Sequence, residues 1–155
     1  MPYTGSKAQS GAQTIININT GTVSTPVWTL IGEVTDIGQS GKQNKTDDVT
    51  NLESTAEEFI PTLLSPGNFK IPVNRVQGDA GQIAVLASFN ALPPTVVLYQ
   101  IILPKTPSQS VSGDKYQFSA MVEEFNDLST IKADKKITSS IGLKVSGPIT
   151  FTAGS

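Results

Sequence analysis

Residues 47–72 read DDVTNLESTAEEFIPTLLSPGNFKIP, and the rest of the chain is organised around this stretch. It begins as a polar, acidic segment and continues as the short apolar run FIPTLL at residues 59–64. It breaks at SPG, residues 65–67, and restarts as an alternating strand. Proline presets φ for the first central position of a turn, and glycine tolerates a positive φ after it. The pattern predicts a loop that leads into a hairpin, and it contains no catalytic signature.

Alternating and two-sided apolar patterns predict a mainly β fold. The expected strands are residues 14–20, 25–37, 68–76, 95–103, 114–125 and 136–146, the last resuming after Gly147-Pro148. Residues 25–37 and 95–103 are apolar on both faces, so both faces should be buried, one of them against another subunit. We expect a β-sandwich or partly rolled barrel of two packed sheets, with one α-helix packed on its side.

The helix is expected at residues 79–92. Asp79 is a favourable N-cap, and Gln82 three residues later completes a capping-box pattern. An apolar stripe at helical spacing is predicted to face the β-core. The stripe consists of Ile83, Leu86 and Phe89.

Composition excludes several classes of function. The chain has 155 residues, 15% charged residues and a net charge of −2, which fits one domain with a weakly charged surface. It contains neither cysteine nor histidine, so disulfides, thiolate metal sites and the commonest general base are excluded. A protein that binds nucleic acid independently of sequence would need a basic face, and the net charge of −2 argues against this class. Residues 1–13 lack the apolar core of a secretory signal and are expected to be a flexible N-terminal arm before a single domain at 14–155.

Two segments resemble ligand-binding motifs, but they lack the residues or the spacing that those motifs require. The segment GQSGK at 38–42 resembles the end of a phosphate loop, but Asp36 stands where the first glycine belongs and Gln43 replaces the magnesium-binding Ser or Thr. The acidic residues near 47–53 lack the spacing and the glycine of a calcium loop. No catalytic residue, cofactor, metal or membrane contact is expected.

The polar segment GQSGKQNKTDDVTN at 38–51 has no periodicity and is predicted to be a long loop that is mobile in the free subunit. Because apolar strands flank it, the loop should project from a rigid base and order against a neighbouring subunit. Its candidate assembly residues are Gln39, Lys42, Asn44, Lys45, Thr46, Asp47, Asp48, Thr50 and Asn51.

Five segments in this order resemble the major tail tube proteins of long, non-contractile-tailed bacteriophages. They are TLIGEVTDIG (29–38), TDDVTNLESTAEEFIPTLLSPGNF (46–69), GDAGQIAVL (78–86), DKYQFSAMVEEF (114–125) and DKKITSSIGLKVSGPIT (134–150). The resemblance covers about residues 25–152, and the ordered series is more specific than any one segment. Thr62 departs from the glycine expected in the family's turn, and no C-terminal immunoglobulin-like domain is expected after Ser155.

The resemblance implies a structural protein of the virion tail, made and assembled in the host cytoplasm. It implies two packed β-sheets with a flanking helix, and hexameric rings that stack into a tube for DNA. Implied partners are further copies of the chain, the tape-measure protein, the tail terminator and tail-tip or baseplate proteins, with duplex DNA held only weakly in the lumen. Closed rings repeated by stacking agree with strands that have two apolar faces.

Three alternatives remain open. The first is an inner tube subunit of a contractile tail or of a type VI-like secretion system, which association with a sheath would distinguish. The second is a β-sandwich that binds glycans or proteins; Trp28, the only tryptophan, lies in an apolar strand and not on an expected sugar-binding surface. The third is an enzyme, which the missing residue types disfavour.

Overall fold

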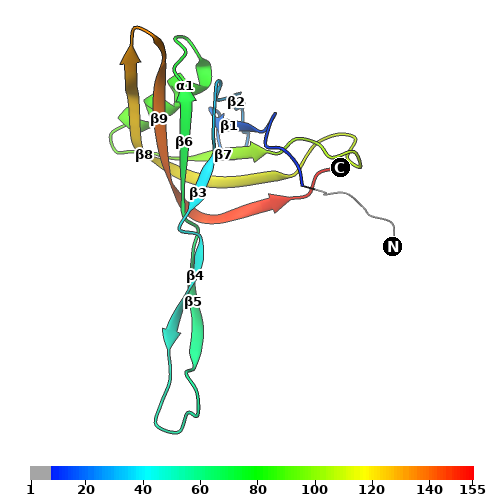
Figure 1. Ribbon diagram of the computed structural model, residues 1–155, viewed down its shortest axis with the longest axis vertical. Coiled ribbons are helices and arrows are strands. Elements are labelled where there is room, and N and C mark those ends of the chain that lie inside the picture. Colours follow the sequence, from blue (N-terminus) through cyan, green and yellow to red (C-terminus); the bar gives the residue numbers. More distant parts are fainter. Residues whose placement is uncertain (1–7) are drawn as a thin grey trace.

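The computed structural model describes residues 8–155, which form nine strands and one helix (Figure 1). The elements are β1 (Ile15–Asn19), β2 (Trp28–Leu30), β3 (Gly38–Ser40), β4 (Gln43–Asp48), β5 (Phe59–Ser65), β6 (Asn68–Asn74), α1 (Ala80–Asn90), β7 (Val96–Ile102), β8 (Lys115–Lys132) and β9 (Lys135–Thr152). Seven strands form one sheet in the order β2-β1-β7-β8-β9-β6-β3, and β4 pairs only with β5.

The large sheet curls because its two longest strands bend. β8 and β9 each run for 18 residues and change direction along their length (Figure 1). Their pairing shifts register between Gln117 and Ser119, opposite Gly147, whose φ is +83°. A bulge of this kind bends a strand and increases its twist. One half of the β8–β9 pair therefore lies beside β7 and β1, and the other half lies beside β6.

The hydrophobic core lies between these two halves. The Phe69 ring in β6 stacks on Phe118 in β8 with centroids 4.7 Å apart, and Phe118 also stacks on Tyr99 in β7 at 5.9 Å. Ile16 and Ile71 are almost completely buried in the same cluster. The expected mainly β fold with a flanking helix is confirmed, and its two packed layers are halves of one continuous curled sheet.

Helix α1 begins where the sequence predicts. The carboxylate of Asp79 accepts a hydrogen bond from the Gln82 backbone N–H at 2.9 Å and a second from the Gly32 N–H at 3.2 Å. Asp79 therefore caps the helix and also ties it to the chain that follows β2. The Gln82 side chain does not complete the capping box; it turns inward and is fully buried.

The predicted buried face of the helix is wrong for Ile83, which is 50% exposed. Leu86 is partly buried against the core, and Phe89, although 37% exposed, packs its ring against the core residue Phe125 with centroids 6.4 Å apart. The buried residues of the helix are Gly81, Gln82, Val85 and Ser88. The helix is apolar on several sides, so periodicity alone does not choose a face. Packing against β2 decides which face of the helix is buried, because Gly81 lies so close to the Leu30 carbonyl that no side chain fits between them.

The predicted long strand at 25–37 is also wrong. Only β2 pairs regularly there, and Val34 forms an isolated bridge with Val73 of β6. The chain breaks at Gly32 and Glu33, and Glu33 adopts a left-handed φ of +57°. The break lets the chain leave β1 and cross to β6, on the other half of the sheet. β1, β6, β7, β8 and β9 match the predicted segments, with β8 and β9 longer than expected, whereas β3 lies in the predicted loop.

Residues 1–7 of the predicted N-terminal arm lie outside the described part of the chain. Residues 8–13 are fixed by hydrogen bonds, since the Gln9 side chain donates to the carbonyls of Pro104 and Lys105 at 2.9 and 3.1 Å. That part of the segment expected to be flexible is therefore attached to the body.

Candidate assembly surface

The predicted loop at 38–51 is instead two strands, and this changes the shape of the molecule. β3 joins the edge of the large sheet beside β6, and β4 pairs with β5 in a separate ribbon. The ribbon projects away from the body along the longest axis of the molecule (Figure 1). We call residues 43–65 the arm. Pro66-Gly67 is correspondingly not a hairpin turn between β5 and β6, because each of these strands pairs elsewhere.

The arm forms without a hydrophobic core of its own. Its register pairs Asn44 with Leu64, Asp47 with Ile60 and Asp48 with Phe59, so each pair sets a polar residue of β4 beside an apolar residue of β5. The sequence pattern of β4 reads as a loop because none of its side chains is buried. Cross-strand hydrogen bonding makes it a strand, and sequence periodicity does not report that pairing.

The end of the arm is held by short hydrogen bonds. Asp48 accepts from the Thr50 N–H at 2.9 Å. Hydrogen bonding to the Thr50 side chain, and to a lesser extent to its backbone, lowers the pKa of the Asp48 carboxyl. The Thr50 hydroxyl accepts from the Glu58 N–H at 2.9 Å, across the base of the turn. Asn51 closes the turn with bonds to Glu53 and Ser54. Polar side chains that bond to nearby backbone are typical of such turns.

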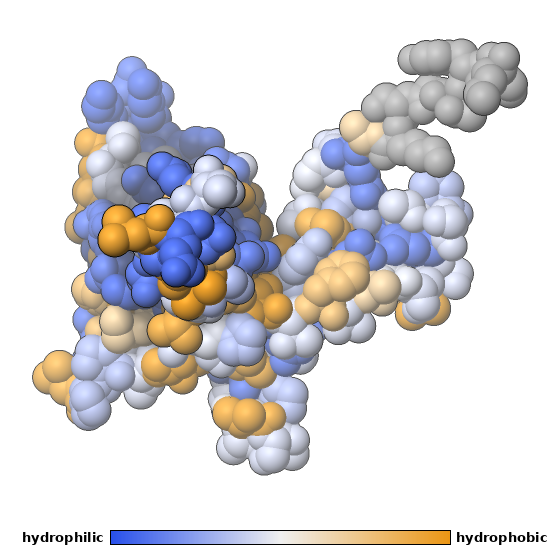
Figure 2. Space-filling model, turned by 90° about the horizontal axis from the view of Figure 1, so that it is seen from below, coloured by the Kyte–Doolittle hydropathy of each residue, from blue (hydrophilic) through white to orange (hydrophobic). Residues whose placement is uncertain are grey.

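Apolar side chains of the arm face solvent. Leu63 is 79% exposed, and the other large apolar residues of β5 are also exposed: Phe59, Ile60 and Leu64. Seen from the end that carries the arm, the surface shows hydrophobic side chains among polar ones (Figure 2). An isolated two-stranded ribbon is marginally stable in water, so this arm has the properties of an element that is completed by contact with another molecule.

Two glycines form the neck where the arm joins the body. Gly41 and Gly67 have φ values of +75° and +85°, which side chains other than glycine rarely adopt. A Cβ on Gly67 would collide with the backbone of Ser40 and Lys42. The Gln39 side chain donates to the Pro66 carbonyl at 3.3 Å and links the two chain segments. The neck therefore fixes where the arm leaves the sheet.

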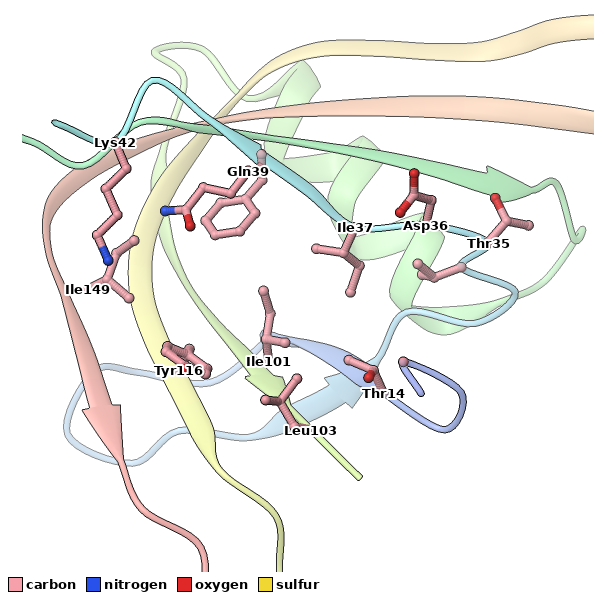
Figure 3. Close-up of a pocket in the computed structure, with 13 residues that line it drawn as sticks. Thr14, Thr35, Asp36, Ile37, Gln39, Lys42, Ile101, Leu103, Tyr116 and Ile149 are labelled. Atoms are coloured by element: carbon pink, nitrogen blue, oxygen red, sulfur yellow. The ribbon is translucent and has the colours of Figure 1, made fainter. Parts of the chain in front are cut away.

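A cavity of about 620 Å³ lies on the body beside the neck (Figure 3). Gln39 and Lys42 extend over it from the neck, and its wall includes Ile101, Tyr116 and Ile149. Among residues 8–155, its charged lining residues are Lys42 and Asp36, so this lining is mainly apolar with one charge of each sign. This composition suits an apolar side chain or peptide segment better than a charged ligand.

The structure brings all nine predicted assembly residues to the arm and its neck. Gln39 and Lys42 lie at the neck, and the rest lie along β4 and the turn at its end: Asn44, Lys45, Thr46, Asp47, Asp48, Thr50 and Asn51. The apolar residues of β5 are not among the predicted assembly residues, because the sequence pattern assigns FIPTLL to a loop and hairpin that continue into residues 68–76. The available signal was the proline at position 61, which is tolerated in edge strands and not in central ones.

The described residues contain no cluster of three or more His, Cys, Asp or Glu side chains that could hold a metal ion. Within residues 8–155, no helix is long and apolar enough to cross a membrane. The features that distinguish this surface are thus shape, exposed apolar side chains and charge.

Comparison with known proteins gives no match to a family model and none to a curated protein. Solved structures do match over nearly the whole chain. A subunit of the tail of an empty GTA (gene transfer agent) particle, determined with C6 symmetry, superposes with a TM-score of 0.68 at 18% identity, covering 94% of this chain and 100% of that one. The SPP1 tail tube superposes with a TM-score of 0.67 at 14% identity, covering 92% and 77%.

The chain has the tail tube fold. A chain from the sheath–tube complex of PVC, an extracellular contractile injection system, also superposes, with a TM-score of 0.65 at 10% identity over 90% of this chain and 88% of that one. The tail tube fold is therefore shared by matches from particles described as tails and from one with a sheath. The resemblance inferred from the five sequence segments is confirmed at the level of the fold.

Proposed function

We propose that this chain is a structural subunit of a virion tail tube, in which six copies close a ring and the rings stack. The observation that carries the proposal is the arm. It is a two-stranded ribbon, and within the described residues its apolar strand β5 is not covered by the body. A ribbon of this kind needs a partner surface. The full-length match to a subunit of a tail with C6 symmetry supports further copies of the chain as that partner.

The direction of the arm fits stacking better than closure of a two-fold dimer. It extends along the longest axis, away from the helix and the large sheet (Figure 1). When one surface contacts a different surface on the next copy, repetition gives rings or filaments, whereas a two-fold contact stops at a dimer. We assign the nine arm and neck residues named above to the contact between rings.

The exposed arm also supports control of assembly. Residues 43–64 have few buried contacts, so the arm belongs to the part of the protein that opens most easily. Fixing a mobile backbone costs on the order of 1 kcal/mol per residue. Contacts with the neighbouring ring must offset that cost, and this requirement keeps free subunits from polymerising before assembly starts.

The tube would serve as a conduit for duplex DNA. The net charge of −2 and the single arginine, Arg75, support a lumen that does not bind phosphates tightly. In a tail, the partners of the tube would be the tape-measure protein inside it, a terminator at one end and tail-tip or baseplate proteins at the other.

A tube inside a contractile sheath is the second candidate function. The match to a sheath–tube complex favours it, because the same fold occurs in that particle. The two functions differ in one measurable property. A subunit of a contractile tail co-assembles with a sheath protein, and a subunit of a non-contractile tail does not.

Removing the arm tests the proposal. The neck brings Lys42 near Gly67, so residues 43–65 can be replaced by a short Gly-Ser linker without stretching the body. We expect wild-type protein at high concentration to form rings and tubes by negative-stain electron microscopy and light scattering. The armless variant should keep the fluorescence of Trp28 and the β-sheet circular dichroism of the body, and should form no tubes.

A point variant provides a finer test with a matched control. Leu63→Ser removes an apolar side chain that is 79% exposed on the arm, and Val23→Ser removes one that is 84% exposed elsewhere. Only Leu63→Ser should shorten or abolish tubes. A wild-type protein that stays monomeric at every concentration and salt tested would contradict the proposed function.

A further inference from the structure

The end of the arm and the turn between β8 and β9 lie at opposite ends of the molecule's longest axis (Figure 1). We call residues 46–59 the acidic tip and residues 128–137 the basic turn. Both protrude from the body, and both carry exposed apolar side chains. Their charges are opposite.

The acidic tip contains five carboxylates and no basic residue. The carboxylates belong to Asp47, Asp48, Glu53, Glu57 and Glu58. The apolar residues Leu52 and Phe59 are exposed between them, by 106% and 54%. The tip therefore combines a strong local negative charge with uncovered apolar area, although the whole chain carries a net charge of only −2.

The basic turn contains three lysines and one carboxylate. Lys132, Lys135 and Lys136 are exposed, and Asp134 lies between them in sequence. The apolar side chains Leu128 and Ile131 are 63% and 62% exposed. Arg75 lies beside the base of the turn, since its backbone N–H donates to the Ile137 carbonyl at 2.9 Å, but its guanidinium bonds to the Gln82 side chain and is not counted with the basic turn.

We propose that the acidic tip of one copy docks on the basic turn of a second copy in the next ring. This inference rests on the proposed function and names the surface that receives the arm. The occupant is a second copy because the two complementary surfaces belong to one chain and point in opposite directions, as a repeating head-to-tail contact requires. The cavity beside the neck is a weaker candidate receiver, because its lining carries one charge of each sign.

The two kinds of side chain have different tasks in this contact. Apolar contact between residues such as Phe59 and Ile131 supplies affinity, and the charged rim supplies selection. Two acidic tips repel each other, as do two basic turns, so rings can stack in one direction only. Because the charges are exposed, salt should weaken stacking between rings.

Charge reversal tests the contact. Asp47, Glu53 and Glu57 make no side-chain hydrogen bonds within residues 8–155, and neither do Lys135 and Lys136, so reversing them leaves the turns intact. We expect Asp47→Lys/Glu53→Lys/Glu57→Lys and Lys135→Glu/Lys136→Glu each to form rings while the stacked fraction falls at least tenfold. Lys105→Glu, an exposed reversal in another loop, is the control; it removes one exposed hydrogen bond to the Ser110 carbonyl and should stack normally.

Mixing the two reversed variants makes the test specific. The variant with the triple reversal has a tip of net charge +1 and a turn of net charge +2, and the other variant has a tip of −5 and a turn of −2. Each should fail alone, and purified rings of the two should stack when combined, because every contact in the alternating tube then joins opposite charges. Normal stacking of either reversed variant alone, or no stacking of the mixture, overturns the inference.

Cross-linking covers the case in which wild-type rings do not stack without an initiating partner. The chain has no cysteine, so any disulfide formed by the single variants Glu57→Cys and Lys136→Cys joins two introduced residues. An equimolar mixture should give mixed dimers in clear excess over either like dimer, and a Lys105→Cys partner should not. Equal yields overturn the inference, whereas failure of the wild-type protein to form rings counts against the proposed function alone.

Discussion

Gly67 lies directly against the carbonyl of Ser40, so close that a Cβ on Gly67 would collide with that oxygen. The two residues belong to the two chain segments that cross at the neck of the arm. Gly67 also has a φ of +85°. Its missing side chain therefore meets two separate needs, one of backbone conformation and one of space.

Gly67→Ala should disturb the direction of the arm. A non-glycine residue at this φ costs about 1–2 kcal/mol, and the collision with Ser40 adds to that cost. Gly78→Ala is the control, because Gly78 has a φ of +82° with no atom near its would-be Cβ. We expect both variants to lose thermal stability and only Gly67→Ala to lose tubes. Equal effects on tube formation would show that the neck crossing has no special role.

Gln82 is the principal polar link between the helix and the sheet. Its side-chain nitrogen donates to the carbonyls of Asn74 at 2.9 Å and Gly32 at 3.1 Å, and its oxygen accepts from Arg75 and Val76. Gln82→Leu fills the space and leaves these groups without partners. Unfolding by urea should show a loss of at least about 1–3 kcal/mol, the cost of one unsatisfied buried group. A loss below about 0.5 kcal/mol would mean that water replaces the side chain.

Gln82 shows which structural features can be predicted from the sequence and which cannot. The N-cap at Asp79 was predictable, because it depends on residues three positions apart. The inward turn of Gln82 depends on carbonyls at positions 32 and 74, which only the folded chain brings together. The arm could not be predicted for a similar reason. β4 has no buried side chain and gains its structure from pairing with β5, so its polar sequence reads as a loop.

By contrast, much of the fold could be predicted from the local alternation of polar and apolar residues. Residues 68–74 and 96–102 are strands as predicted, since their side chains alternate or lie against two layers. The candidate interface residues were found because they are polar and lie together in sequence, and the arm keeps them together in space. The acidic tip was visible as a charge cluster, but its relation to the lysines at 132–136 required the three-dimensional arrangement.

The helix face can be tested with two aliphatic residues. Val85 is fully buried and Ile83 is 50% exposed, although the sequence pattern placed Ile83 in the stripe that faces the core. Val85→Ala should reduce the free energy of unfolding by about 2 kcal/mol, from two lost methyl groups and the cavity they leave. Ile83→Ala should cost less than about 1 kcal/mol. A larger loss of unfolding free energy for Ile83→Ala in the free subunit would show that Ile83 faces the core, as the sequence pattern predicted.

Tyr99 gives a prediction about alkaline pH. Its ring is fully buried, its hydroxyl has no hydrogen-bond partner among the described residues, and burial raises its pKa. Above about pH 10 the unfolded chain releases this proton and the folded chain keeps it, so stability falls as pH rises, by at most about 1.4 kcal/mol per pH unit. Tyr99→Phe should be as stable as wild type or about 1 kcal/mol more stable at pH 7. Its advantage should grow between pH 9 and 11, and a constant difference would indicate that the hydroxyl is solvated.

DNA binding by the assembled tube is the last prediction. Outside the arm the chain has ten basic and eight acidic residues, so the rest of the chain carries a net charge of only +2. Each phosphate contact contributes about −0.9 to the slope of log affinity against log salt for duplex DNA. We expect fluorescence anisotropy with a labelled duplex to show weak binding at 50 mM salt and a slope shallower than about −2, equivalent to two phosphate contacts or fewer. A conduit needs this weakness, because each tight contact would slow the passage of DNA. Strong binding that disappears steeply between 50 and 200 mM salt would indicate a lumen lined with lysines, and the neutral conduit would then be wrong.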